Sequence, residues 1–198
     1  MRIIDPLEEG NVYHIFNRGV NSEDIFIENR NYYYFLTQYE KYCLPVIDTY
    51  AFVLLKNHFH LLVKIKPAII QPRRDGKGDI SITATKQLSH FFNSYAQAIN
   101  KASNRHGKLF EEPFARKEIS NDSYFTALIY YIHFNPQQHG FVKDFRDWQF
   151  SSYRSIMEEQ DNFIRRDEVI DWFGSRIGFE QAHLGNIPMQ NIQDMLIE

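Results

Sequence analysis

Residues 50–66 read YAFVLLKNHFHLLVKIK, an apolar run rich in β-branched and aromatic residues that is interrupted at Lys56 and Asn57. Strand-forming residues on both sides of a short polar break predict a β-hairpin. We expect strands at Val46–Leu55 and His58–Ile65, joined by a tight turn in which Asn57 can adopt a positive φ. This hairpin anchors the predicted fold.

The returning strand begins with two histidines, His58 and His60, on either side of Phe59. Side chains alternate between the faces of a strand, so the histidines share one face, about 7 Å apart, while Phe59 points into the core. Two imidazoles side by side form half of a metal site. A His-x-His pair on a strand can equally be two partly exposed polar residues.

Apolar residues also recur at regular spacings in the segments before and after the hairpin. Helical and alternating periodicities together favour an α+β fold, with helices packed on an antiparallel sheet of about four to five strands. Residues 66–80 contain two prolines, two glycines and clustered basic residues, so we expect a loop that is poorly ordered without a ligand. The other expected elements are a strand at Asn11–Asn17, helices at Asn29–Cys43 and Ile82–Ala102, a strand at Phe114–Ile119, a helix from Asn121 that Pro136 stops, and a short helix at Asp167–Phe173 in a loop-rich C-terminal part.

The composition fits one substantial core. The chain has 198 residues, of which 43% are hydrophobic, and this is enough for a domain that folds unaided. The single cysteine, Cys43, excludes an internal disulfide and suits a reducing compartment. The sequence shows no secretory signal and no apolar stretch of membrane-spanning length, so we expect a cytoplasmic protein without membrane contact.

The net charge of −3 conceals a strong asymmetry along the chain. Residues 56–117 contain twelve Lys and Arg against four Asp and Glu, a net charge of +8. The preceding segment has four basic and eight acidic residues, and the following one has six and thirteen. A basic middle between acidic flanks can bind phosphates, or it can be an ordinary solvated face.

A second pair of polar residues completes a candidate constellation. Tyr131 and Asn135 are four residues apart on a predicted helix, which makes them neighbours with Cβ atoms about 6 Å apart. A tyrosine hydroxyl can act as a covalent nucleophile, and an amide oxygen can join two imidazoles around a divalent cation. The alternatives are a core tyrosine in an aromatic helix and an asparagine that terminates the helix before Pro136.

The order of several motifs resembles a known family, the single-tyrosine HUH transposases, and most closely the REP-associated tyrosine transposases of bacteria. HUH describes two histidines around a hydrophobic residue, as in His58, Phe59 and His60. The resemblance covers roughly Asn11 to Ser155, and its five segments are more specific than a His-x-His pair alone. They are YHIFNRG (13–19), NHFHLLV (57–63), FFNSYAQAINKASNRHGKLFEEPF (91–114), YYIHFNPQQHGFV (130–142) and DWQFSSY (147–153).

This resemblance implies a ferredoxin-like HUH fold for a catalytic domain at residues 1–155, followed by a C-terminal extension at 156–198 that is mostly helical or irregular. It implies that Tyr131 is the nucleophile and that Asn135 is the third metal ligand beside the two histidines. The implied activity is cleavage and rejoining of single-stranded DNA beside small hairpins, through a 5′-phosphotyrosine and with Mg²⁺ or Mn²⁺. The implied protein acts as a monomer or a homodimer.

The basic middle of the chain supplies cations that could neutralise DNA phosphates. Such contacts position DNA without reading its sequence. Arg18, at the end of a predicted strand, could also lie near the site, or it could be an ordinary surface arginine. The residues expected to bind DNA are Arg73, Arg74, Lys77, Lys101, Arg105, Lys108, Arg116 and Lys117.

Three functions remain open from the sequence. The first is a transposase-like enzyme that uses Tyr131, and the second is a domesticated, non-catalytic protein that binds structured single-stranded nucleic acid. The third is a metal hydrolase that uses His58 and His60 with water as the nucleophile. A covalent protein–DNA adduct would distinguish the first from the other two.

Overall fold

The computed structural model describes residues 4–73, 75–111, 113–159 and 163–185. The first strand, the hairpin and the helices at residues 29–43 and 84–102 lie where the sequence predicts them. In chain order the elements are β1 (Val12–Arg18), the 3-10 helix η1 (Val20–Ser22), α1 (Asn29–Cys43), β2 (Ile47–Leu54), β3 (His58–Ile65), β4 (Ile69–Pro72), β5 (Asp79–Ile82), α2 (Ala84–Ala102), β6 (Ala115–Glu118), α3 (Asp122–Gln138), the 3-10 helix η2 (Phe145–Asp147), α4 (Ser152–Met157), α5 (Arg166–Trp172) and α6 (Arg176–Leu184).

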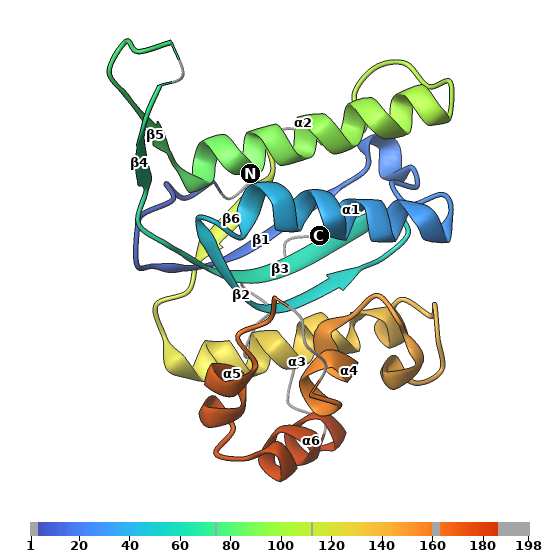
Figure 1. The fold of residues 1–198 in the computed structure, drawn as a ribbon. Coiled ribbons are helices and arrows are strands. Elements are labelled where there is room, and N and C mark those ends of the chain that lie inside the picture. The colour runs from blue at the N-terminus through green and yellow to red at the C-terminus, as the bar shows by residue number, and fades with distance from the viewer. Residues whose placement is uncertain (1–3, 74, 112, 160–162, 186–198) are drawn as a thin grey trace.

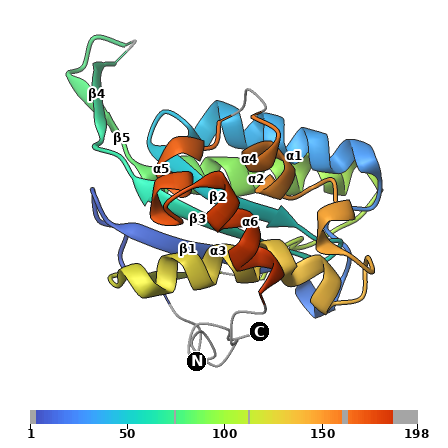
Figure 2. The ribbon, with the colours of Figure 1, turned by 90° about the horizontal axis from the view of Figure 1, so that it is seen from below.

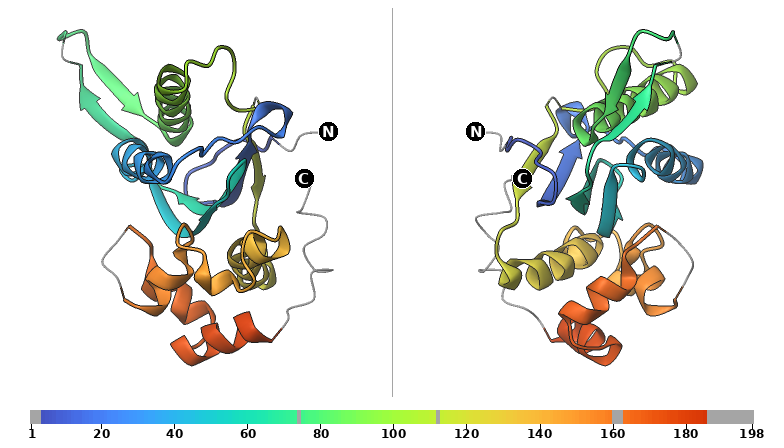
Figure 3. Two further views of the ribbon diagram at one scale, coloured as in Figure 1. Left: turned by 90° about the vertical axis from the view of Figure 1, so that its right-hand side faces the viewer. Right: turned by 60° about the vertical axis from the view of Figure 1, so that its left-hand side comes forward.

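The described part of the chain forms a main sheet of four strands in the order β2-β3-β1-β6, with each neighbouring pair antiparallel. One helix connects β1 to β2 and another leads from β3 toward β6, which is the βαββαβ order of a ferredoxin-like fold. Helices α1 and α2 cover one face of the sheet, and α3 to α6 cover the other (Figures 1 and 3). The predicted α+β class is confirmed. No helix that the structure describes is long and apolar enough to cross a membrane.

β3 is buried on both faces over most of its length because helices cover the sheet from both sides. It begins at His58 and ends at Ile65, as the sequence predicts. Phe59 is fully buried on the α1 and α2 side, with its ring centroid 5.2 Å from that of Phe35 and 5.6 Å from that of Phe92. His58 and His60 therefore face α3 on the opposite side.

Helix α3 does not stop at Pro136, contrary to the expectation from sequence, and runs two residues further to Gln138. Proline removes one N–H donor and disfavours helical backbone in the residue before it. Here the backbone after the proline closes the helix end: His139 N donates to Asn135 O at 3.0 Å, and Phe141 N donates to Pro136 O at 2.9 Å. Asn135 consequently lies within the helix.

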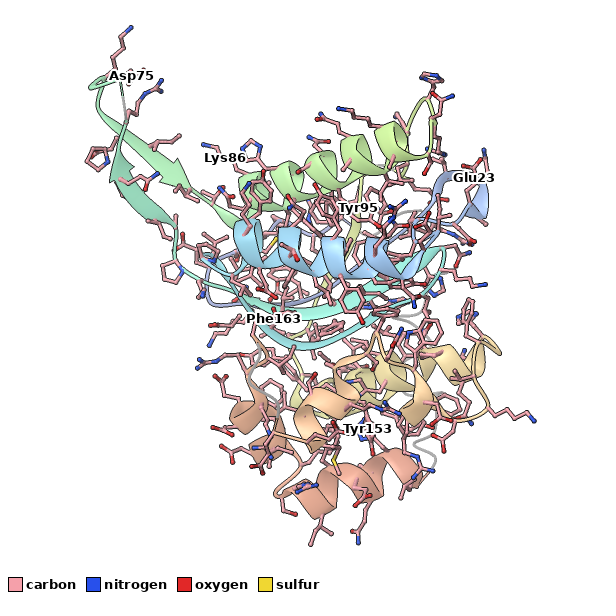
Figure 4. All side chains as sticks on the ribbon, turned by 45° about the vertical axis from the view of Figure 1, so that its right-hand side comes forward. Glu23, Asp75, Lys86, Tyr95, Tyr153 and Phe163 are labelled. Carbon is pink, nitrogen blue, oxygen red and sulfur yellow. The ribbon has the colours of Figure 1, made fainter. Side chains whose placement is uncertain are left out.

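Residues 66–80, expected to form a poorly ordered loop, instead contribute to an antiparallel ribbon of β4 and β5. β-branched isoleucines on both strands favour pairing, and Arg73 N donates to Gly78 O at 2.8 Å to close the turn. Gly76 and Gly78 adopt positive φ values there, which costs glycine little. The ribbon projects from the body, with Asp75 at its tip (Figure 4).

The C-terminal part contains more regular structure than the expected single short helix. α5 matches that expectation within one residue, while α4 and α6 were not predicted. All three lie on the α3 side of the sheet (Figure 2). Val53 and Thr49 on the outer edge of β2 bridge to Ser151 and Ile164, so this part also covers a sheet edge. The proposed domain boundary at residue 155 falls inside α4 and stays a prediction.

A chain of buried hydrogen bonds joins α6 to α3, α4 and β2. Burial lowers the pKa of His133 well below its usual value and that of His183 to about 4, so both imidazoles are neutral near pH 7. His183 Nδ1 donates to Phe179 O at 2.7 Å, which leaves Nε2 to accept from His133 Nδ1 at 2.8 Å. Ser152 Oγ donates to His133 Nε2 at 2.7 Å and accepts from Phe52 N at 2.9 Å.

Ser152→Ala would leave Phe52 N–H and His133 Nε2 without partners in the core. Each unsatisfied buried group costs roughly 1–3 kcal/mol, so we expect the free energy of unfolding in urea at pH 7.5 to fall by roughly 2–6 kcal/mol. The control is Ser151→Ala, which removes the N-cap of α4 and should cost about 1 kcal/mol. Equal losses for the two variants would contradict the account.

The lowered pKa of His183 predicts a stability that depends on pH. The unfolded histidine titrates near 6.5 and the folded one near 4, so the unfolded chain takes up this proton first as the pH falls. The stabilisation is complete above about pH 6.5 and declines toward about pH 4, by roughly 2 kcal/mol at pH 5. Between pH 7.5 and pH 5, urea unfolding should show a smaller loss of unfolding free energy in His183→Gln than in the wild-type protein. An identical loss in the two proteins would refute this assignment.

Candidate metal and tyrosine site

The four residues of the predicted constellation lie together between β3 and α3. His58 Nε2 is 3.1 Å from Asn135 Oδ1. The ring centroids of His58 and His60 are 5.3 Å apart, and those of His60 and Tyr131 are 5.4 Å apart in an edge-to-face arrangement. The strand alternation and the helical four-residue spacing thus place all four side chains in one cluster, as the sequence suggested.

Hydrogen bonding determines which nitrogen of His58 carries a proton. Asn57 Nδ2 donates to Ser22 O at 3.4 Å, which turns Asn57 Oδ1 toward His58 Nδ1 at 2.8 Å. An amide oxygen only accepts, so Nδ1 carries the proton of a neutral imidazole and Nε2 carries a lone pair. That lone pair faces Asn135 Oδ1, which is also an acceptor.

His60 is oriented by a residue that the sequence analysis did not single out, His14 on β1. His14 Nε2 lies 3.0 Å from His60 Nδ1, and both side chains are buried. Within the described residues, His60 Nε2 has no hydrogen-bond partner, and neither do His14 Nδ1 and Asn135 Nδ2. Such buried unpaired atoms are rare and call for an explanation.

The local electrostatics keep these imidazoles neutral. Burial lowers the pKa of His60 well below its usual value, and the neighbouring His14, His58 and His139 lower it further. Burial also lowers the pKa of His14 to about 3, with a smaller contribution from Lys117. Neutral imidazole is the form that binds metal ions.

The lone pairs that meet in this cluster fit a divalent cation. His58 Nε2 and Asn135 Oδ1 present lone pairs to each other, and His60 Nε2 presents a third if His60 Nδ1 donates its proton to His14. Two imidazole nitrogens and one amide oxygen suit Mn²⁺ better than Mg²⁺, which prefers an all-oxygen shell. No group of three or more His, Cys, Asp or Glu residues that could hold a metal occurs in the described ranges, so a cation here depends on the amide.

Two adjacent tyrosines on α3 have different surroundings. Tyr131 faces His60, whereas Tyr130 stacks on Phe134 at 5.4 Å and lies 5.9 Å from His183 on the α6 side. Only Tyr131 therefore belongs to the histidine cluster. Its side chain is fully buried, so a bulky substrate can reach it only if the neighbouring segments move.

Two further residues approach the site at the start of β3. Arg18 pairs with His58 in the β1–β3 register and so shares its face, and its guanidinium donates to Ser22 Oγ at 2.9 Å. The exposed His139 has its ring centroid 5.0 Å from that of His58. The alternation in YHIFNRG hinted at His14 and Arg18, but only the strand register brings them to these partners.

The predicted phosphate contacts of the ribbon lie away from this cluster. Arg73 forms an ion pair with Asp75 at 2.9 Å, Lys77 is exposed, and Arg74 lies outside the described residues. The ribbon follows the far end of β3, about 23 Å along the strand from His58. These cations and the histidine cluster therefore do not form one compact site.

The other predicted cations lie on β6 and around the C-terminal end of α2. Lys101 and Lys108 are exposed around the C-terminal end of α2, and Arg105 there forms an ion pair with Glu23. On β6, Lys117 pairs with His14 and shares its face, while Arg116 points to the opposite face. The structure thus separates the seven predicted contacts that it describes into a ribbon group and a group beside β6 and α2.

Comparisons with known proteins confirm the resemblance seen in the motifs. No protein-family model matches the chain. A Haemophilus influenzae protein named as a candidate REP-associated tyrosine transposase is 27% identical over 111 residues, which cover 54% of this chain and 58% of that protein. A solved REP-associated tyrosine transposase bound to a REP hairpin shares the fold, with a TM-score of 0.60 and 16% identity over 82% of this chain and 89% of the other.

The hydrogen bond between His14 and His60 predicts an effect on metal affinity. His14→Phe keeps an aromatic ring next to Phe16 but removes the acceptor that fixes His60. Loss of such a partner typically weakens metal binding by about 10- to 100-fold, which calorimetry with Mn²⁺ would measure. His14→Gln, which keeps an acceptor, should recover part of the affinity. Unchanged affinity in His14→Phe would rule out the positioning role.

Proposed function

We propose that this protein cleaves and rejoins single-stranded DNA beside hairpins, in the manner of a transposase, with Tyr131 as the nucleophile. In this proposal His58, His60 and Asn135 hold one divalent cation, Mg²⁺ or Mn²⁺. The observation that carries the proposal is the meeting of Tyr131 with three potential ligand atoms, of which His60 Nε2 is buried without a hydrogen-bond partner in the described residues. A structural core would have little use for such a group.

The chemistry assigned to the chain is a transesterification. Tyr131 loses its hydroxyl proton and its oxygen attacks a DNA phosphorus; a new oxygen–phosphorus bond forms while the bond to the 3′ oxygen breaks. The 3′ oxygen takes a proton and leaves as a hydroxyl, and the 5′ phosphate stays on Tyr131. A bound cation would supply neutralisation of charge on the phosphate oxygens. Because the phosphotyrosine conserves the bond energy, a later 3′-hydroxyl can reverse the step.

Hairpin-forming DNA is the proposed substrate. The similar solved structure is described as bound to a REP hairpin, and the curated relative carries the same family name. In this chain, Lys117 lies beside His14 and Arg18 lies beside His58, so cations flank the cluster on its β1 and β6 side. The ribbon cations Arg73 and Lys77 would contact DNA farther from the cleaved bond, because the ribbon lies at the other end of β3.

Binding without catalysis is the second candidate function. The complete burial of Tyr131 favours it, because a DNA phosphate cannot reach the hydroxyl in this conformation. The catalytic proposal therefore requires that DNA binding displaces a segment over the tyrosine. A non-catalytic protein would bind the same hairpins with Tyr131 remaining covered.

The direct test is a covalent adduct. Labelled single-stranded hairpin oligonucleotides would be incubated with the protein and Mn²⁺, denatured and separated by electrophoresis. We expect label to migrate with the wild-type protein and with Tyr130→Phe, since Tyr130 faces α6. Tyr131→Phe should reduce the adduct by at least about a thousandfold while hairpin binding is kept.

Three outcomes distinguish the functions. An adduct that persists in Tyr131→Phe would refute the assigned nucleophile. Cleavage without any adduct would indicate a hydrolase that uses water. Tight hairpin binding with neither cleavage nor adduct would support the non-catalytic function.

A further inference from the structure

The segment that follows β1 folds back in a tight turn beside the start of β3. Gly19 N donates to Asn57 O at 2.8 Å, so this turn lies against the connection between β2 and β3. A Cβ atom on Gly19 would lie 2.1 Å from Glu23 O, and only glycine fits there. Figure 4 shows Glu23 of this turn at the opposite end of the molecule from Asp75 of the ribbon. The turn therefore lies at the His58 end of the sheet.

Two consecutive residues of this turn have a left-handed backbone. Asn21 has a φ of 56° and Ser22 a φ of 60°, values that residues other than glycine seldom adopt. Such residues persist where surrounding contacts fix them, and they cluster at functional sites. Here Ser22 N donates to Gly19 O at 3.1 Å, and Val20 N donates to Leu109 O at 3.1 Å. These bonds hold Ser22 in one position.

Ser22 connects a cation to one of the proposed metal ligands. Its hydroxyl oxygen accepts from the Arg18 guanidinium at 2.9 Å. Its carbonyl oxygen accepts from Asn57 Nδ2 at 3.4 Å, and Asn57 Oδ1 accepts from His58 Nδ1 at 2.8 Å. Arg18 is also directly opposite His58 in the β1–β3 register, and such neighbours have Cβ atoms about 5 Å apart. One serine thus holds the guanidinium near this imidazole.

No ion pair between Arg18 and a carboxylate occurs in the part of the chain that the structure describes. Its guanidinium donates to the neutral hydroxyl of Ser22, whereas most other described arginines pair with acidic side chains. Arg18 is partly buried, and a guanidinium stays protonated in proteins. Its planar fork of N–H donors matches two oxygens of one phosphate. A phosphate near His58 would therefore gain a cation that no carboxylate competes for.

We propose that Arg18 is a catalytic residue whose guanidinium binds the scissile phosphate and stabilises the charge that develops when Tyr131 attacks. This inference rests on the proposed function and assigns it a residue for the transition state. A phosphodiester carries one negative charge, and the deprotonated tyrosine oxygen brings a second to the oxygens around phosphorus. Donors aimed at those oxygens bind this state more tightly than the substrate. Arg18 forms no covalent bond and keeps its proton; it exchanges the Ser22 hydroxyl for the phosphate.

The test measures the rate of adduct formation in a single turnover, with a saturating labelled hairpin oligonucleotide and Mn²⁺. We expect Arg18→Ala to slow this step about 100- to 1,000-fold, as loss of one transition-state donor does. Arg18→Gln, which keeps a donor for Ser22 without the charge, should be comparably slow. Arg18→Lys, which keeps the charge without the fork, should lie between Arg18→Ala and wild type.

Binding measurements separate this role from a structural one. In all three variants the hairpin dissociation constant in EDTA, and the Mn²⁺ affinity from calorimetry, should change much less than the rate. Guanidinium ion at a non-denaturing concentration should restore part of the rate of Arg18→Ala, whereas ammonium ion should not, because only guanidinium supplies the planar fork. Arg30→Ala, which removes an exposed arginine that pairs with Glu28, should react like wild type.

A wild-type rate in Arg18→Ala would overturn the inference. A fall in hairpin or Mn²⁺ affinity by the same factor as the rate would also overturn it, because a backbone contact away from the reacting phosphate or a structural role produces that result. Equal rescue by ammonium would count against the phosphate fork in the same way. A failure of the proposed function looks different, since the wild-type protein itself would then form no adduct.

Discussion

The pleat of β3 at residues 58–60 is the constraint on which the proposed site depends. Phe59 is held among Phe35 and Phe92 on one side of the sheet, so the two flanking histidines must face α3 on the other. A register shift of one residue would turn both histidines into the aromatic core and Phe59 toward α3. The aromatic packing around Phe59 therefore both stabilises the sheet and fixes the face on which the two imidazoles lie.

The histidine cluster contains buried polar atoms that have no hydrogen-bond partner in the described residues. Unsatisfied buried polar atoms cost roughly 1–3 kcal/mol each, and His60 Nε2 and Asn135 Nδ2 are two of them. The surrounding core offsets this cost, and the Ser152–His133–His183 chain shows how the same fold pairs buried histidines fully where no ligand is proposed. The buried histidines His133 and His183 are thus hydrogen-bonded at every ring nitrogen, whereas the histidine cluster keeps buried atoms without a partner in the described residues. This contrast supports a ligand site at the first group rather than a structural role.

Local patterns predicted much of this arrangement, because strand alternation and helix periodicity are properties of short segments. They placed His58, His60, Tyr131 and Asn135 and the limits of α1 and β3. They could not identify His14, whose contact with His60 depends on the register between β1 and β3. The ribbon of β4 and β5 was not predicted because the prolines and glycines of residues 66–80 indicate a loop more strongly than its isoleucines indicate strands. Helix α6 was not predicted because its packing on His133 depends on tertiary contacts.

The central claim is that two imidazoles and one amide oxygen bind a single cation next to Tyr131. Pulsed electron paramagnetic resonance of Mn²⁺ bound to protein labelled with ¹⁵N-histidine tests it most directly. The account predicts couplings from two histidine nitrogens, with one lost in His58→Ala and the other in His60→Ala. Bound Mn²⁺ without any histidine coupling, or couplings that persist in both variants, would contradict it.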